Sequence, residues 1–260
     1  GRLGRLKEAA ELLQHPALWK AGALQQQAKG ISTGFETLDR HLPGNGWPVA
    51  GLCELMLPTS GIGELKLLLP ALKALSRQAR WITWVNPPFI PYAPALKAAG
   101  VDIDKILLIH PKTHKDALWA LERATRSGTC SAALAWLDEA QLKTKDTQRL
   151  QLAARQGGTL SCLFRPEKAM TENSMAELRI WVRRGSEETL NVNLCKRRGG
   201  WPVSGLSLSL EEGRRPAEIR EQLSLWRQCR ATGTPPAADP SDLSPLLRPI
   251  LTDVGQHVTH

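Results

Sequence analysis

Short apolar runs alternate with stretches of helical periodicity through the middle of the chain. The runs contain few polar residues, which is typical of strands buried on both faces of a parallel sheet. We expect a strand, a turn and a helix within 51–69, further strands at 81–85, 105–109, 132–138 and 159–164, and helices at 91–99, 115–126 and 147–155. This order predicts βαβ units, and hence an α/β fold with a mostly parallel sheet covered by helices on both faces.

The pattern changes after Phe164, where apolar and polar residues begin to alternate. Segments 176–182, 188–196 and 204–210 show this alternation and are joined by turn sequences. Such alternation is typical of antiparallel strands with one solvated face. We therefore expect antiparallel strands to extend the sheet on its C-terminal side.

The two ends of the chain differ from this central part. Residues 2–28 have helical spacing and carry an excess of basic residues, and Pro16 interrupts the pattern. Beyond residue 211 the chain is polar, with a helical stripe at 216–230 followed by a Pro- and Ser-rich stretch. The sequence thus predicts a helical N-terminal arm at 1–29, a core at 30–212, and a C-terminal helix with a flexible, partly disordered tail at 213–260.

Composition limits the class of protein. Hydrophobic residues make up 42% of the chain, yet no apolar run approaches the ~18 residues needed to span a membrane, and no signal peptide is recognisable. The five cysteines are scattered, which favours buried free thiols in a reducing compartment. The net charge of +9 favours a polyanionic partner, although the basic residues are diffuse. We expect a cytoplasmic protein without a membrane partner.

The stretch 51–69 has the layout of a phosphate-binding loop, in which backbone amides at a helix start cradle phosphates. The usual pattern is GxxxxGK[ST], but its lysine position holds Gly63 and its hydroxyl position holds Glu64. A carboxylate ~4 Å from a phosphate costs about 4 kcal/mol near a protein surface. We expect Glu64 to cap the helix instead, and no nucleotide cofactor to bind. The degenerate loop comprises Leu57, Pro58, Gly61, Ile62, Gly63 and Glu64.

Several segments in order resemble the RecA recombinase core. They are STGFETLDRHL at 32–42, GWPVAGLCEL at 46–55, AGVDIDKILLIHP at 99–111 and the stretch from Asp116 to Gln141. The resemblance covers about 31–210 and implies a RecA-like core in which Asp138 lies at the Walker B position. It also places the catalytic glutamate position at about Pro88, and the γ-phosphate-sensing pair at Phe164 and Arg165. These departures imply that the ATPase residues are lost and that the protein is not an enzyme.

The SGIGEL loop and the HPALW sequence at 15–19 make the chain resemble the ImuA family more closely. That resemblance implies a non-catalytic accessory factor in SOS-induced translesion DNA synthesis, a pathway of DNA repair and mutagenesis after DNA damage. ImuB and RecA would be its protein partners, and the protein would be associated with the nucleoid. Two alternatives stand beside this interpretation. One is an active DNA-dependent ATPase of the RecA/KaiC type, and the other is an inhibitor of the division protein FtsZ like SulA, a more distant resemblance.

Basic residues on two expected strands and their turns form a candidate DNA-binding surface. If the hairpins bring them together, they could follow a phosphate backbone without sequence preference, with Trp181 or Trp201 available for stacking. The alternative is a set of solvated turn charges. The candidates are Arg179, Arg183, Arg184, Lys196, Arg197 and Arg198.

Two short segments are candidate partner sites. QLSLW at 222–226 resembles a sliding-clamp motif that would use Gln222, Leu223, Leu225 and Trp226, but the same residues also fit one face of a helix. Leu18 and Trp19 lie beside the break in the N-terminal arm. They could contact RecA, ImuB or a second copy of the chain through self-association, or pack within the chain.

No pattern in the sequence indicates catalysis by a metal or a nucleophile. The six histidines have no ligand spacing, since a proline and a strand end separate His110 from His114. No GxSxG or Cys–His signature is present. We expect no metal site and no catalytic residues.

Overall fold

An eight-stranded sheet organises residues 29–211, which are the residues that the computed structural model describes. The strand order is β3-β2-β4-β5-β1-β6-β7-β8, and all neighbours from β3 to β6 are parallel, whereas β7 and β8 are antiparallel. The strands are β1 Gly51–Leu57, β2 Trp81–Val85, β3 Ile106–Ile109, β4 Cys130–Trp136, β5 Leu160–Pro166, β6 Leu178–Arg184, β7 Thr189–Lys196 and β8 Val203–Ser209. The predicted α/β class and the antiparallel extension are confirmed.

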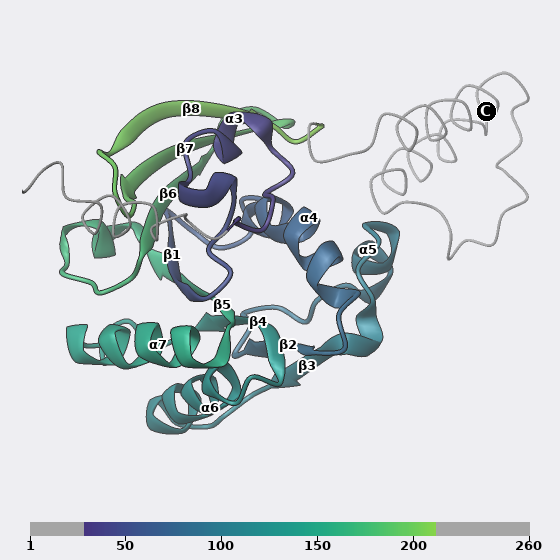
Figure 1. Cartoon of the computed structure of the whole chain (residues 1–260), viewed down its shortest axis with the longest axis vertical. Coiled ribbons are helices and arrows are strands. Elements are labelled where there is room, and N and C mark those ends of the chain that lie inside the picture. Colours follow the sequence, from purple (N-terminus) through teal and green to yellow (C-terminus); the bar gives the residue numbers. More distant parts are fainter. Residues whose placement is uncertain (1–28, 212–260) are drawn as a thin grey trace, which may run out of the picture.

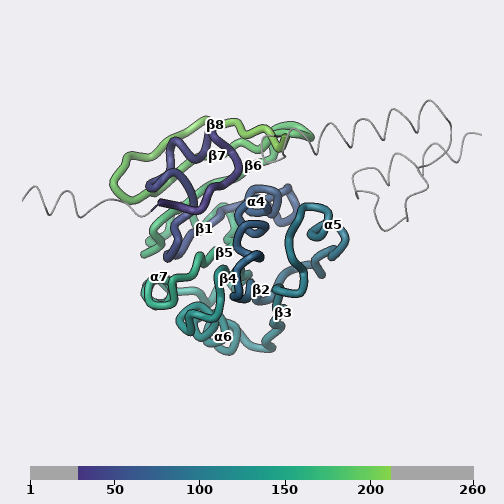
Figure 2. The backbone as a smooth tube through the Cα atoms, turned by 45° about the vertical axis from the view of Figure 1, so that its right-hand side comes forward, coloured from purple at the N-terminus to yellow at the C-terminus, as the bar shows by residue number. Residues whose placement is uncertain are grey.

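Helices cover both faces of the parallel part of the sheet (Figures 1 and 2). On one face, α4 and α5 pack in the larger apolar core, and on the other α6 and α7 form a second apolar core. The longer helices are α4 Glu64–Ser76, α5 Ala93–Ala98, α6 His114–Arg126 and α7 Thr144–Gly157. Short elements are α3 Glu36–Asp39 and the 3-10 turns Pro43–Asn45, Ile103–Lys105 and Glu167–Thr171.

The strands of the parallel part are buried on both faces, as their apolar runs predict. In β1 every residue from Gly51 to Leu57 is buried, with Leu55 in the first core and Leu52 in the second. Helix α6 turns Leu118 and Leu121 toward the second core, in agreement with its periodicity. Strand alternation and helix periodicity thus separate the same sheet into two apolar layers.

Element boundaries differ from the sequence-based expectation at β4 and α7. The strand ends at Trp136, before the expected 138, because Asp138 accepts backbone and side-chain hydrogen bonds that form a turn. Helix α7 begins at Thr144 instead of 147, since the Lys143 amide donates to the Asp146 carboxylate at 3.0 Å and caps the helix start. Local polar bonds, which periodicity does not reveal, set both ends.

The cysteines of the described residues are mostly buried. Cys53, Cys130 and Cys162 are buried free thiols, and Cys195 is partly buried. Burial raises the pKa of the Cys53 thiol well above its ordinary value.

Among residues 29–211, the structure contains no helix with the length and apolar character that a membrane span requires. The predicted arm and the predicted C-terminal helix and tail lie almost entirely outside the described residues.

Helices α6 and α7 meet closely at Gly157, the last residue of α7. A Cβ added to Gly157 would lie 1.8 Å from the Thr125 carbonyl oxygen, which already accepts the Thr159 hydroxyl at 2.9 Å. Helix propensity alone would favour alanine over glycine by ~1 kcal/mol. The close contact outweighs this preference for alanine, because neither helix backbone can move away without disturbing the second core.

We predict that Gly157→Ala lowers the free energy of unfolding by about 2 kcal/mol, the typical cost of overpacking. Urea denaturation followed by circular dichroism measures the change. Gln156→Ala, at an exposed position of the same helix, is the matched control and should be neutral or slightly stabilising. Equal stability of Gly157→Ala and the parent chain would show that the contact between the helices is not tight.

Candidate functional site

The loop between β1 and α4 is filled by the protein's own carboxylate. Gly61 and Gly63 adopt positive φ values of 88° and 103°, which favour glycine. Their amides donate to the two carboxylate oxygens of Glu64 at 2.9 and 3.1 Å, and Glu64 is buried. The amides that would face a phosphate in a phosphate-binding loop therefore already have an acceptor. The geometry agrees with the expected capping role of Glu64.

The remaining residues of the degenerate loop serve structural roles. Leu57 is buried at the end of β1, and Ile62 packs against the larger core. Pro58 is exposed at the start of the turn. None of these side chains offers a charge or a donor to a phosphate.

Asp138, the candidate Walker B residue, stabilises the turn after β4. Its carboxylate accepts the Gln141 side-chain amide at 2.6 Å and the Ala140 backbone amide at 3.0 Å. These two hydrogen bonds lower the pKa of Asp138 below its ordinary value. Over residues 29–211, no three His, Cys, Asp or Glu side chains come together as a metal site would require.

The other positions that correspond to ATPase residues hold unrelated side chains. Pro88 is exposed in the loop after β2. Phe164 stacks on Trp136 with ring centroids 4.3 Å apart and an interplanar angle of 6°. Arg165 is buried in an ion-pair network.

The candidate DNA-binding residues do not form one strip, and this part of the prediction is wrong. Arg179 is 7% exposed and donates to Glu54 and to the Ala169 carbonyl oxygen. The β6–β7 register places Arg179 opposite Lys196, whereas Arg183 and Arg184 lie at the other end of the hairpin. At 3.4 Å per residue, the two ends are about 15 Å apart.

Most of the other candidate cations already have partners. Arg183 pairs with Glu167 at 2.8 Å and lies over the Trp181 ring, while the Trp181 indole also donates to Glu167. Lys196 donates to the Ser174 carbonyl oxygen at 3.0 Å, and Arg197 donates to the carbonyl oxygens of Trp201 and His41. Arg198 lies 3.7 Å from Glu177, and Arg184 is exposed. These contacts favour the alternative of structural and solvated charges.

The candidate partner residues lie outside the described range. They are Leu18, Trp19, Gln222, Leu223, Leu225 and Trp226. Their assignment to partner contacts stays a prediction.

Sequence reasoning missed a buried ion-pair network at the carboxyl end of the sheet. Glu54 on β1 has no exposed surface and accepts Arg165 on β5 at 3.0 Å, Arg179 on β6 at 2.7 Å and the Ser174 hydroxyl at 2.5 Å. Arg165 also contacts Glu139 and Glu172. Burial by itself would lower the pKa of Arg165, but the contacts with Glu139 and Glu54 outweigh it and raise that pKa. The available signal was the single charged residue in each of β1 and β5, Glu54 and Arg165.

A second missed feature is an apolar surface at the β3 edge of the sheet. Among the strands of residues 29–211, β3 pairs only with β2, and its residues Leu107 and Leu108 are 46% and 40% exposed on opposite faces of the strand. The loop after β2 adds Phe89 and Ile90, which are 69% and 86% exposed, and Tyr92, which is 46% exposed. We call these five residues the β3-edge surface. An apolar edge strand with free backbone groups can pair with another chain.

The fold and these features define an α/β protein whose helix-start loop holds its own carboxylate and which exposes several apolar side chains at and near a sheet edge. Residues 58–161, from the turn after β1 to the start of β5, match the family model "Cell division inhibitor SulA". The comparisons therefore relate this segment of the chain to the SulA cell division inhibitor family.

Similarity to individual SulA proteins covers the same part of the chain. SulA of Photorhabdus laumondii is 38% identical over 114 residues, which are 44% of this chain and 63% of that protein. SulA of Pectobacterium atrosepticum is 36% identical over 103 residues, which are 40% of this chain and 61% of that protein. The chain thus spans less than two thirds of the length of these relatives. The crystal structure of SulA from Pseudomonas aeruginosa is 30% identical, covering 44% of this chain and 97% of that one, with a TM-score of 0.37.

These comparisons overturn the interpretation of the chain as an ImuA-type factor of translesion DNA synthesis. The matched family and the relatives are named as cell division inhibitors, so ImuB and RecA are wrong as partners. Binding to the sliding clamp or to DNA stays a prediction. The alternative of a SulA-like protein fits the comparisons better. The relatives are named as inhibitors and not for a catalytic activity.

We predict that Glu54→Gln lowers the free energy of unfolding by about 3–5 kcal/mol, since it leaves two buried guanidinium groups without their shared carboxylate. Denaturant titration measures the loss. Glu36→Gln is the matched control, because its ion pair with Arg40 is exposed on both sides and should matter much less. A similar small effect for both variants would contradict a structural role of Glu54.

Proposed function

We propose that the protein is a SulA-type inhibitor of cell division that acts in the SOS response by binding the division protein FtsZ in the cytoplasm. The match of residues 58–161 to the SulA family carries this proposal. Identities of 38% and 36% to two named SulA proteins support it. The chain extends beyond the matched segment on both sides, and we propose that 30–212 form its core, with 1–29 and 213–260 flanking it.

We also propose that the core is a RecA-like fold that has lost nucleotide turnover. The β1–loop–α4 unit and the parallel strands followed by two antiparallel ones support a relation to nucleotide-binding α/β proteins. The Glu64 carboxylate holds the loop amides through two hydrogen bonds. Inhibition would then depend on binding a partner, without a reaction at this loop.

We propose the β3-edge surface as the part that contacts FtsZ. It lies within the matched segment and exposes five large apolar side chains. Burial of such side chains is the main source of affinity in protein interfaces, and a few of them usually dominate it. The strand β3 contains only Ile and Leu, so its outer edge could accept an added strand without burying a charge.

We predict that overproduction of the full chain in a rod-shaped bacterium causes filamentation, and that the purified chain reduces sedimentable FtsZ polymer in the presence of GTP. The double variant Phe89→Ser, Ile90→Ser should weaken FtsZ binding by about tenfold or more, because it removes two exposed apolar contacts. Microscopy, polymer sedimentation and a direct FtsZ-binding titration measure these effects.

The matched control is Trp119→Ser with Leu152→Ser, which removes two exposed apolar side chains from α6 and α7 instead. It should inhibit like the parent chain. Absence of filamentation together with unchanged FtsZ polymer would overturn the proposed function. Inhibition that survives the Phe89 and Ile90 substitutions would overturn the assignment of the surface only.

We predict that the chain does not bind Mg-ATP at millimolar concentration, because Glu64 occupies the amides that a phosphate needs and no lysine follows Gly61 in the loop. Isothermal titration calorimetry with Mg-ATP tests this directly. Micromolar binding, or hydrolysis that Asp138→Ala abolishes, would instead support an active ATPase.

A further inference from the structure

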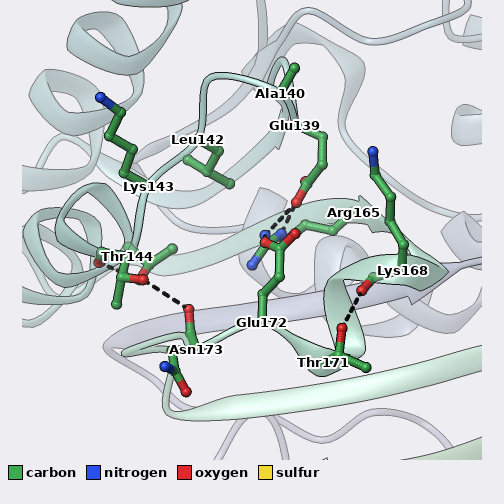
Figure 3. Close-up of a pocket in the computed structure, with 11 residues that line it drawn as sticks. Glu139, Ala140, Leu142, Lys143, Thr144, Arg165, Lys168, Thr171, Glu172 and Asn173 are labelled. Carbon is green, nitrogen blue, oxygen red and sulfur yellow. Dashed lines mark hydrogen bonds and ion pairs between the residues drawn. The ribbon is translucent and has the colours of Figure 1, made fainter.

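A polar cavity of about 630 Å³ opens at the carboxyl ends of β4 and β5. The turn after β4, the start of α7 and the segment after β5 enclose it (Figure 3). In open α/β sheets, ligands usually bind at the carboxyl ends of the strands. The cavity is separate from the loop between β1 and α4 and from the β3-edge surface, and its lining contains no residue of either.

The floor of the cavity is the guanidinium group of Arg165, whose side chain is 3% exposed. One edge of this group faces Glu139, which accepts from Nε at 3.1 Å and from Nη2. The same Nη2 atom also donates to Glu172 at 2.7 Å. Glu139 and Glu172 approach Arg165 from opposite sides in Figure 3. One nitrogen thus holds two carboxylates.

The two carboxylates differ in how firmly they are held. The Glu139 side chain is 12% exposed and makes two hydrogen bonds with Arg165, whereas the Glu172 side chain is 46% exposed and makes one. Glu172 follows the 3-10 turn Glu167–Thr171 and belongs to no strand or helix. Glu172 is therefore the carboxylate that can leave Arg165 for solvent at the lower cost.

Two lysines stand at the rim of the cavity. The side chains of Lys143 and Lys168 extend from opposite rims of the cavity (Figure 3). Both residues are exposed. The positive charge of Lys168 contributes to the lowered pKa of Asp138. Asn173 lines the cavity beside Thr144, whose hydroxyl donates to the Asn173 carbonyl oxygen at 3.3 Å.

We propose that this cavity binds a carboxylate group of an acidic peptide, which takes the place of Glu172 on Arg165 and is held at the rim by Lys143 and Lys168. The charges of the floor favour a single carboxylate over a phosphate. If one carboxylate replaces another on Arg165, the net charge around Arg165, Glu139 and Glu54 stays the same. A phosphate dianion would bring a second negative charge next to Glu139. A cation would be repelled by the positive charges of Arg165 and both lysines.

This arrangement makes Glu172 an internal competitor of the ligand. A competitor that must be displaced lowers the apparent affinity by its own occupancy of the site. Its removal should therefore tighten binding, although it deletes a side chain from the cavity. Such a gain distinguishes displacement from a purely structural role for Glu172.

The experiment measures fluorescence anisotropy of a fluorescein-labelled peptide of alternating Glu and Gly with the full chain at low salt. The parent chain should bind it, and the same peptide with Gln in place of Glu should not bind. Glu172→Ala should tighten binding about fivefold, the value of one partly exposed ion pair. Lys143→Ala with Lys168→Ala should weaken it about tenfold. Thermal denaturation verifies that each variant is folded.

Lys112→Ala with Lys145→Ala is the matched control, since both lysines are exposed but lie outside the cavity lining. It should bind like the parent chain. Absence of binding to both the parent chain and Glu172→Ala would overturn the proposal, as would equal binding of the Gln peptide. A peptide with phosphoserine in place of Glu that binds more tightly through the same lysines would overturn the carboxylate class. None of these outcomes bears on FtsZ inhibition, which rests on a different surface.

Discussion

A buried carboxylate in the middle of the sheet, Glu54, determines how its two halves join. It has no exposed surface, and a charge in such a position costs several kcal/mol unless it is paired and hydrogen-bonded. Strand β1 lies between β5 and β6, and each neighbour supplies one arginine to this carboxylate. The network therefore requires β6 to lie beside β1 in one register. The antiparallel strands β7 and β8 then extend the sheet beyond β6.

The same network shapes the carboxyl end of the sheet. Arg179 donates to the carbonyl oxygens of Ala169 and Glu172, which holds the segment between β5 and β6 against β1. Arg165 extends from the buried centre to the cavity, where its outer nitrogen contacts Glu139 and Glu172. An arginine that is fixed from behind by Glu54 keeps its orientation at low entropic cost. The interaction that stabilises the sheet thus also fixes a cationic group at the floor of the cavity.

The sheet could be predicted from the sequence because strands buried on both faces appear as apolar runs. In the strands after Phe164, apolar and polar residues alternate, which indicates one solvated face. The role of Arg179 could not be predicted in this way. Alternation shows which face of a strand a residue occupies, but the partner of Arg179 is Glu54, which is 125 residues away. Charge patterns along the chain therefore suggested a basic strip where the structure has a buried ion pair at one end and solvated charges at the other. The β3-edge surface was hidden for a related reason, since apolar residues of an edge strand look like core residues until the strand order is known.

The degenerate loop bears on the fold of this protein, whereas the matched segment bears on its function. The segments before β1 and around 99–111 reflect the needs of an α/β core, and a fold can host many unrelated functions. They suggested a RecA-type architecture, but they carried no information about the partner. The match to the division inhibitors begins at residue 58, after the strand that holds Glu54, and ends at 161 within β5. It therefore includes β3 and the loop between β2 and α5, where the β3-edge surface lies. It excludes β6, whose Arg179 completes the buried network, and the strands β7 and β8. Similarity to the division inhibitors is thus found in the part of the sheet that carries the proposed contact surface.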